Sequence, residues 1–299
     1  MSTYGPSGRS AWLDIDWREH QRWIEVDGSA VNVIDLGPTE GAADGVPIVW
    51  IHGLAGSWQN WLENLPYFAR TRRCVALDLP GFGASPMPEQ PISIAGYART
   101  VDALLRELGI PHAAVVGNSM GGFVGAEIAI SFPTWVSRLV LVSAAGITAE
   151  HARFGRLVPL LRNADRVAKL AVGVVAPSSD DLARRPRSRQ AMLRYVAAHP
   201  DRLPVPLVAE QLRGTGKPGF FDALATLTSY PLRDRLDKIT APTLVVWGAA
   251  DRLVPVRDAW EFGRLIDRAR VVVYEDTGHV PMLERPDAFN ALVAEFLQE

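Results

Sequence analysis

The chain has 299 residues, of which 48% are hydrophobic and 21% are charged, so it is long and apolar enough to bury a large core. Its formal net charge of −2 provides no global positive field, which argues against binding to nucleic acid or to an anionic membrane. The single cysteine, Cys74, excludes an intramolecular disulfide, and its apolar neighbours predict an inert thiol in a buried strand.

The N-terminal residues are rich in Ser and Gly, and they lack the basic and then apolar regions of a signal peptide. No apolar run approaches the roughly 18–20 residues that a membrane span requires. We therefore expect a cytoplasmic protein with no integral membrane segment and with a small molecule, not a nucleic acid, as its partner. The sequence leaves the oligomeric state open.

Short strand-like segments recur along most of the chain. Two alternating stretches, residues 22–26 and 30–36, flank Asp27-Gly28 and predict a β-hairpin. Continuous apolar runs follow, of the kind found in strands buried on both faces of a parallel sheet. These runs span residues 47–51, 74–77, 113–116, 139–142, 243–247 and 271–274.

Helical patterns alternate with these runs. The clearest begins after Ser93, an N-cap residue type, and ends before Gly109, a C′ residue type. Two others span residues 120–132 and 286–297. Strands that alternate with helices predict βαβ units and a mostly parallel sheet with helices on both faces.

The alternation is interrupted between residues 146 and 238, where the sequence is helix-like, contains several prolines and has no strong strand run. We expect residues 1–145 and 239–299 to form an α/β core and residues 146–238 to form a helical cap. Such a cap would cover the C-terminal ends of the strands, where open α/β sheets bind ligands. A solvated helix face is expected for a group of basic residues in this insertion: Arg184, Arg185, Arg187 and Arg189.

The segment Gly117-Asn118-Ser119-Met120-Gly121 matches the pattern G-x-S-x-G, and it follows a predicted strand and opens a predicted helix. The chain must turn sharply there, and bulky side chains two positions before or after the serine would collide. Gly117 and Gly121 remove that obstacle. The turn lifts the Ser119 hydroxyl above the sheet, with a helix N-terminus beneath it.

With this motif in this context, the chain resembles the α/β-hydrolase family over nearly its whole length. The resemblance implies a mostly parallel eight-stranded sheet, a cap inserted between strands 6 and 7, and Ser119 as nucleophile. It also implies an oxyanion hole formed by the backbone amides of Met120 and Leu54. Two donors aimed at the developing charge contribute roughly 3–4 kcal/mol each in measured enzymes. His52 and Asp78 are implied to brace loops.

The acid and the base are expected beyond later strand ends. Asp251 follows the strand at residues 243–247, and His279 follows the strand at residues 271–274. The resulting order Ser, Asp, His is the order that this fold requires. Asp258 is expected to be a surface residue of the next helix, and Asp276 is too close along the chain to orient His279.

These residues predict acyl transfer without a cofactor. His279 would take the Ser119 proton, Asp251 would orient the imidazole, and water would then cleave the acyl-enzyme. The sequence contains no H-E-x-x-H, C-x-x-C or G-x-G-x-x-G pattern, so we expect no metal and no dinucleotide.

The leading hypothesis for the substrate is a hydrophobic carboxylic ester, because the predicted cap is rich in apolar side chains and Leu54 makes the oxyanion wall apolar. Six residues are expected to contact it: Phe154, Leu157, Leu161, Phe220, Phe221 and Val280.

Alternatives remain open. The segment from Gly117 to Gly122 is similar to that of meta-cleavage product hydrolases, which cleave carbon–carbon bonds, but those enzymes carry Trp where this chain has Val280. Their oxyanion loop is also richer in glycine than residues 52–56. Perhydrolase activity without a cofactor is a further alternative. From another class, the chain is a candidate for a non-catalytic binder or receptor. Ser119 argues against dehalogenation and epoxide opening, which use an Asp nucleophile.

Overall fold

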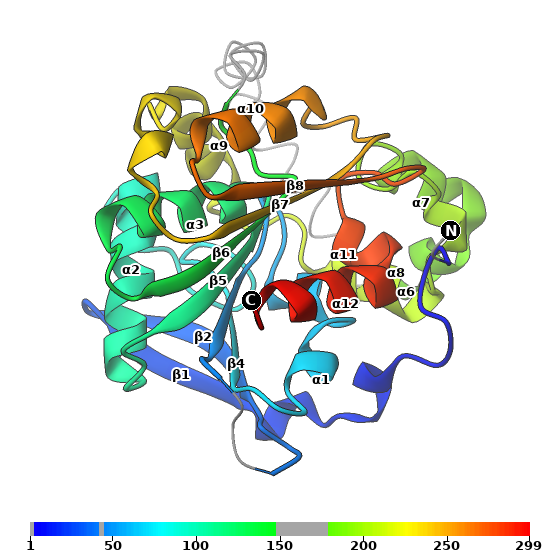
Figure 1. Cartoon of the computed structure of the whole chain (residues 1–299). Helices are drawn as coiled ribbons and strands as arrows, with labels where there is room; N and C mark the ends of the chain where they lie inside the picture. Colours follow the sequence, from blue (N-terminus) through cyan, green and yellow to red (C-terminus); the bar gives the residue numbers. More distant parts are fainter. Residues whose placement is uncertain (1–2, 42–44, 148–178) are drawn as a thin grey trace.

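The structure is a computed structural model that describes residues 3–41, 45–147 and 179–299 (Figure 1). In these ranges eight strands form one sheet, in the order β1-β2-β4-β3-β5-β6-β7-β8. The strands are β1 (Gln21–Val26), β2 (Ser29–Leu36), β3 (Ile48–Ile51), β4 (Cys74–Leu77), β5 (Ala113–Asn118), β6 (Val136–Val142), β7 (Thr243–Gly248) and β8 (Ala269–Tyr274).

The sheet begins with the predicted hairpin and continues as a parallel array. β1 pairs antiparallel with β2 through a two-residue turn at Asp27 and Gly28, whose φ angles of 50° and 77° suit the right-handed twist of the hairpin. β2 is also antiparallel to β4, whereas the pairs from β4 to β8 are all parallel. The predicted fold class, a mostly parallel eight-stranded sheet, is therefore confirmed.

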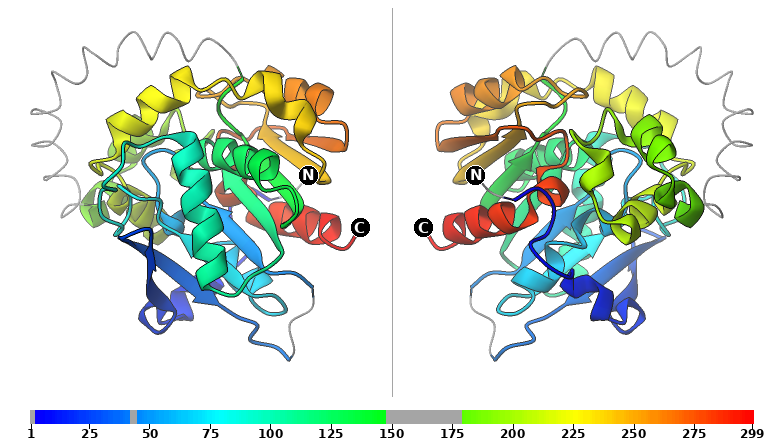
Figure 2. Two further views of the ribbon diagram at one scale, coloured as in Figure 1. Left: turned by 90° about the vertical axis from the view of Figure 1, so that its left-hand side faces the viewer. Right: turned by 90° about the vertical axis from the view of Figure 1, so that its right-hand side faces the viewer.

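Helices cover both faces of the sheet (Figures 1 and 2). They are α1 (Leu65–Phe68), α2 (Ile94–Glu107), α3 (Met120–Ser131), α10 (Arg257–Leu265), α11 (Pro281–Glu284) and α12 (Pro286–Phe296). α2, α3 and α10 pack on one face, and α1, α11 and α12 pack on the other. Neighbouring strand residues such as Trp50 and Ile51 therefore enter different halves of the core, since side chains alternate across a strand.

Short 3₁₀ turns complete the N-terminal half of the core. They are η1 (Ala11–Asp14), η2 (Trp17–Glu19) and η3 (Trp58–Trp61).

Cys74 lies fully buried in β4, and burial raises the pKa of its thiol to about 12. The thiol therefore stays protonated near neutral pH, as expected of an inert core cysteine.

Between β6 and β7 the described residues 179–238 form only helices and turns, and we call them the helical insertion. Its elements are α6 (Ser179–Arg184), α7 (Pro186–Leu193), η4 (Pro200–Arg202), α8 (Val205–Arg213), α9 (Phe220–Ser229) and η5 (Arg233–Lys238). The division of the chain into a core and a cap stays a prediction. Among the described helices, none has the length and apolarity of a membrane span.

Two charged residues expected at the surface are buried, so these expectations were wrong. Arg189 is 6% exposed, and its guanidinium donates to the carbonyl of Leu203 at 2.7 Å. Asp258 is 1% exposed and lies in the first turn of α10, where the positive end of the helix dipole favours a carboxylate. Helical periodicity identifies a polar face, but it does not reveal which carbonyls another segment brings against that face, as at Arg189.

The N-cap of α2 allows a test of the predicted start of this helix. The Ser93 hydroxyl accepts a hydrogen bond from the Gly96 amide at 3.0 Å. Ser93→Ala removes this acceptor and should lower the free energy of unfolding by about 1 kcal/mol. Urea denaturation would measure the difference, and Ser93→Asp, which keeps an acceptor, is the matched control. Equal stability of the Ala variant and the wild type would contradict the assignment.

Candidate active site

Ser119 lies in a strained turn between β5 and α3. Its φ of 54° and ψ of −114° are unusual for a residue with a side chain. Backbone hydrogen bonds hold it there: its amide donates to Val142, and its carbonyl accepts from Phe123 and Ala145 at 3.1 and 3.0 Å. The turn therefore presents the hydroxyl at the C-terminal edge of the sheet, as the G-x-S-x-G motif predicts.

The glycines around Ser119 are required because backbone lies where their side chains would be. A Cβ on Gly117 would lie 2.2 Å from the carbonyl oxygen of Gly121, and a Cβ on Gly121 would lie 2.1 Å from that of Ile51. Gly122 is similarly close to Ala144, at 2.7 Å. These contacts agree with the steric argument made from the sequence.

His279 and Asp251 meet although 28 positions separate them. The Nδ1 atom of His279 lies 2.8 Å from Oδ2 of Asp251, and both side chains are buried. The other carboxylate oxygen accepts from the amides of Leu253 and Val254 at 2.8 and 3.0 Å. Since a carboxylate only accepts, Nδ1 carries the proton and Nε2 is left with a free lone pair. This is the tautomer that a general base needs.

The turn at Ser119 and the loop of His279 are joined directly. The buried amide of Asn118 donates to the carbonyl of Val142 at 3.1 Å and to the carbonyl of His279 at 3.2 Å. Ser119 and His279 also line the same cavity. The structure therefore brings the three residues predicted from separate strand ends into one region.

The loop at residues 52–56 lies against the serine. A Cβ on Gly53 would be 3.2 Å from Cβ of Ser119. His52 is fully buried beneath the loop: its Nδ1 donates to the carbonyl of Gly53 and its Nε2 accepts from the amide of Leu79. Burial lowers the pKa of His52, so the ring stays neutral and braces the loop, as expected.

Asp78 braces the same region. Its carboxylate accepts from the amides of Trp58 and Ala84, each at 2.8 Å, and from the side chain of Asn32. These donors belong to the start of η3, to the loop after β4 and to β2, so the carboxylate connects three segments. The expectation that Asp78 is a loop residue agrees with these contacts.

Two backbone amides at the site remain available. Leu54 lines the cavity, and Met120 follows Ser119 as the first residue of α3. Neither amide donates a hydrogen bond to any acceptor within the described ranges. Unsatisfied N–H groups at a cavity are suited to binding an anionic oxygen.

A cavity of about 430 Å³ adjoins Ser119. Its walls come from the loop at residues 53–56, from the strand ends and from the helical insertion, and they are mainly aliphatic and aromatic. Apart from Ser119 and His279, polar side chains enter it from Asn60, Asn118, Gln211 and Thr215. Among the described lining residues there is no Asp, Glu, Lys or Arg.

A family model described as alpha/beta hydrolase fold matches residues 46–286. The chain belongs to the alpha/beta hydrolase fold family. Over 278 residues it is 30% identical to the 2-hydroxy-6-oxo-6-phenylhexa-2,4-dienoate hydrolase of Comamonas testosteroni, an alignment that covers 86% of this chain and 90% of that relative.

Solved structures agree with this assignment. A bacterial membrane phospholipase A is 28% identical, with a TM-score of 0.69 and coverage of 93% of this chain and 85% of that one. A mutant meta-cleavage product hydrolase from Pseudomonas fluorescens, complexed with acetates, is 25% identical with a TM-score of 0.70, covering 94% and 98%. Family and relatives support a hydrolase, and they differ in the bond that is cleaved.

Only some of the predicted substrate contacts of this alpha/beta hydrolase reach the cavity. Phe220 and Val280 line it. Phe221 is not among its described lining residues: successive helix residues point about 100° apart, and its ring packs edge-on against Phe220 at 5.2 Å, so its contact with the substrate stays a prediction. The remaining predicted contacts, Phe154, Leu157 and Leu161, lie outside the described residues.

The cavity wall contains a polar pair that the sequence pattern did not predict. Asn60 of η3 donates to Oε1 of Gln211 in α8 at 2.6 Å, and Gln211 donates to the carbonyl of Gln59 at 2.9 Å. The pair connects the helical insertion to the segment after the loop at residues 52–56. Gln211 lies next to Leu212 on an otherwise apolar helix face, and a polar residue there was the available signal.

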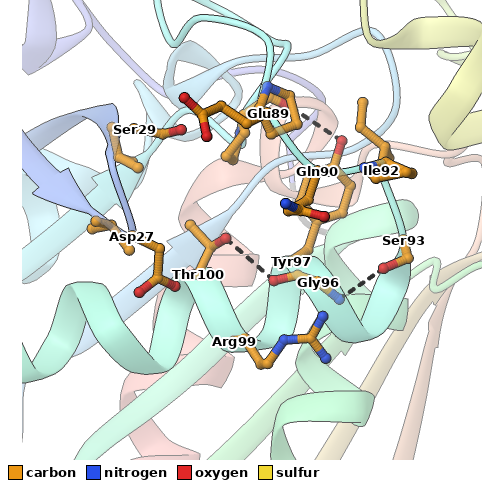
Figure 3. Close-up of a pocket in the computed structure, with 15 residues that line it drawn as sticks. Asp27, Ser29, Glu89, Gln90, Ile92, Ser93, Gly96, Tyr97, Arg99 and Thr100 are labelled. Carbon is orange, nitrogen blue, oxygen red and sulfur yellow. Dashed lines mark hydrogen bonds between the residues drawn. The ribbon is translucent and has the colours of Figure 1, made fainter.

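A second cavity lies away from Ser119. Figure 3 shows this cavity of about 150 Å³, between the turn at Asp27 and the start of α2. Two of its hydrogen bonds, from Gly96 to Ser93 and from Thr100 to Gly96, are local to the helix, and a third runs from the hydroxyl of Tyr97 to the carbonyl of Pro80 at 3.1 Å. It shares no lining residue with the cavity at Ser119 and contains no histidine.

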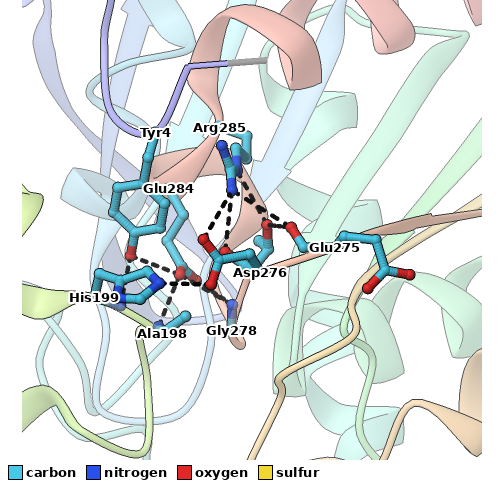
Figure 4. Close-up of polar contacts among 9 residues, drawn as sticks. Tyr4, Ala198, His199, Glu275, Asp276, Gly278, Glu284 and Arg285 are labelled. Atoms are coloured by element: carbon cyan, nitrogen blue, oxygen red, sulfur yellow. Dashed lines mark hydrogen bonds and ion pairs between the residues drawn. The ribbon is translucent and has the colours of Figure 1, made fainter. Parts of the chain in front are cut away.

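Asp276 does not contact His279 but pairs with His199 of the helical insertion, at 2.6 Å (Figure 4). The hydrogen bond from His199 lowers the pKa of Asp276. Within the described ranges no three His, Cys, Asp or Glu side chains cluster as metal ligands do.

The turn at Ser119 yields a stability prediction. Gly121→Ala places a Cβ against backbone, whereas Gly125→Ala in the same helix meets only side-chain methyl groups of Leu139 and Val115, at 3.3 Å. Gly121→Ala should therefore destabilise the protein by about 3 kcal/mol or more, and Gly125→Ala by clearly less. Urea unfolding of both variants would measure this, and a larger loss in Gly125→Ala would refute the steric argument.

Proposed function

We propose that this protein is a serine hydrolase that cleaves a hydrophobic carboxylic ester through an acyl-enzyme on Ser119. The observation that carries the proposal is the buried pair of His279 and Asp251, 2.8 Å apart, at a cavity whose wall also holds Ser119 on a strained turn. The pairing at Nδ1 with Asp251 and the shared cavity with Ser119 are what a general base for this serine requires.

In the proposed mechanism, His279 Nε2 accepts the proton of Ser119 as the serine oxygen attacks the acyl carbon. Asp251 stabilises the imidazolium that forms and keeps the ring in position. The imidazolium then protonates the leaving alcohol. Water, deprotonated by His279, attacks the acyl-enzyme. The imidazolium then gives this proton to the Ser119 oxygen as the acid leaves, so that Ser119 and His279 regain their starting protonation.

The oxyanion is proposed to bind to the amides of Leu54 and Met120. Neither amide has an acceptor within the described ranges, which supports this role. Both N–H groups are therefore available to the substrate oxygen, and their hydrogen bonds strengthen as negative charge develops on it. The brace of His52 on Gly53 and Leu79 keeps the first amide in place before substrate arrives.

The cavity wall supports a neutral, apolar substrate. With no charged side chain among its described lining residues, it offers no counter-ion for a substrate carboxylate. Phe220, Leu224, Leu227 and Val280 offer apolar surface instead. An uncharged ester therefore matches the wall better than a dianionic substrate does.

The first test is turnover of p-nitrophenyl esters of increasing acyl length. Ser119→Ala should lose at least about 1,000-fold in kcat because the nucleophile is removed. Ser143→Ala is the matched control, since the Ser143 hydroxyl is buried and has no partner in the described structure. Equal turnover by wild type and Ser119→Ala would contradict the mechanism.

Labelling by a fluorophosphonate tests the non-catalytic alternative. Wild-type protein should be labelled at Ser119, and Ser119→Ala should not, because the probe needs an activated serine. Peptide mass spectrometry would locate the adduct. Absence of labelling at Ser119 would favour a binder or receptor.

Asp251→Asn keeps the size of the side chain but removes the carboxylate that selects the histidine tautomer. We expect kcat to fall by about 100- to 10,000-fold with a small change in KM. Steady-state kinetics with a p-nitrophenyl ester would measure this. Asp276→Asn is the matched control, because Asp276 contacts His199 and not His279. An unchanged kcat in Asp251→Asn would exclude Asp251 as the acid.

Carbon–carbon bond hydrolysis is the second candidate, and the 30% identity to the dienoate hydrolase of Comamonas testosteroni favours it. Val280 and the uncharged cavity wall argue for the ester. Incubation with a coloured dienoate ring-cleavage product separates the two, since cleavage bleaches the colour. A kcat/KM for the dienoate above that for every ester would replace the first proposal by the second.

A further inference from the structure

Glu284 is a fully buried carboxylate that lies behind the loop of His279, at the end of α11 (Figure 4). It does not line the cavity at Ser119. The catalytic mechanism proposed above therefore gives it no task, although a buried charge is costly unless many donors surround it. Its hydrogen bonds show which groups those donors are.

The carboxylate holds the backbone on both sides of His279. The amide of Gly278 lies 2.9 Å from both oxygens, and the amide of Val280 lies 3.3 Å from Oε1. The amide of His279 itself donates to the carbonyl of Val196 in the helical insertion, at 2.8 Å. Three consecutive N–H groups are thus fixed, so the base loop has little freedom to rotate.

The same carboxylate reaches two distant segments. Its Oε2 atom accepts from the amide of Ala198 at 2.8 Å and from the hydroxyl of Tyr4 at 2.7 Å. The Tyr4 hydroxyl in turn accepts from the amide of His199 at 2.9 Å. The N-terminal segment, the helical insertion and the base loop therefore meet at one side chain.

The loop of His279 packs closely against the helical insertion. A Cβ on Gly278 would lie 2.8 Å from the amide nitrogen of Ala198 and 2.9 Å from the carbonyl of Val196. The next residue, Arg285, holds the preceding part of the loop, since it donates to the hydroxyl of Thr277 and to the carbonyl of Asp276. Amides and carbonyls of one loop are thus held by adjacent side chains of opposite charge.

We propose that Glu284 is a positioning residue that sets the distance between the His279 ring and Ser119 and connects it to the helical insertion. This inference rests on the proposed function, because it requires His279 to be the base. It follows from the direct hydrogen bonds to the residues before and after His279. A shift of about 1 Å in a reacting group costs as much as 100-fold in rate.

Glu284→Gln is a sharp test because the amide has nearly the same shape. A carboxamide has one accepting oxygen, and its NH₂ group must face either the amide of Val280 or the amide of Ala198. Either orientation sets two donors against each other. The loop must then move, although no volume is lost.

Glu284→Gln should lower kcat for a p-nitrophenyl ester by about 10- to 100-fold, with KM changed by less than about 3-fold. The rate of fluorophosphonate labelling per folded molecule should fall by a similar factor. Tyr4→Phe is the matched control: it removes one donor to Oε2 on the side away from His279. It should lower the melting temperature and leave kcat within about 3-fold of wild type.

A kcat for Glu284→Gln within about 3-fold of wild type would overturn the inference, since Glu284 would then serve stability alone. An equal loss of kcat in Tyr4→Phe would also overturn it, since the loss would then not depend on the amides that flank His279. If Glu284→Gln yields no folded protein, Glu284→Asp is judged by the same criterion. Wild-type turnover that is lost in Ser119→Ala shows that the proposed function stands, whatever the result at Glu284. Wild-type protein without Ser119-dependent turnover would overturn both.

Discussion

The sharp turn between β5 and α3 is the constraint on which the rest of the site depends. Ser119 has a backbone conformation that isolated chains avoid, and the chain maintains it with hydrogen bonds to Val142, Phe123 and Ala145. The turn is possible only because residues 117 and 121 are glycines. Backbone atoms of neighbouring segments occupy the space that side chains at Gly117 and Gly121 would need. A parallel sheet supplies this rigidity because its strands are bonded on both sides.

Around that turn, the buried polar groups divide into those that hold backbone and those that remain available. His52, Asp78 and Glu284 direct their hydrogen-bonding atoms at amides and carbonyls of loops. The proposed chemistry uses what is left: the hydroxyl of Ser119, Nε2 of His279 and free amides. Buried braces cost desolvation, but they hold loops in place without a rearrangement during the reaction.

Predictions from local pattern agree with the structure where one segment decides the outcome. The apolar run at residues 74–77 is β4, and the N-cap and C′ residues of α2 lie at Ser93 and Gly109. β6 begins at Val136, three residues before the predicted run. The apolar pattern missed this start because Ser137 and Arg138, which are only partly buried, interrupt it. An error arose where a partner came from another segment, as for Arg189, whose guanidinium donates to the carbonyl of Leu203.

The sequence by itself determined the fold class, the strand ends and the candidates Ser119, Asp251 and His279, because a parallel sheet brings residues that follow its strands to one edge. Tertiary structure alone decided that Asp251 reaches Nδ1 of His279 and that Glu284 holds the flanking amides. It also decided that Asn60 pairs with Gln211, 151 positions away. The physical reason is that a hydrogen bond requires two atoms to be placed to within a few tenths of an ångström, and periodicity along the chain does not encode such positions.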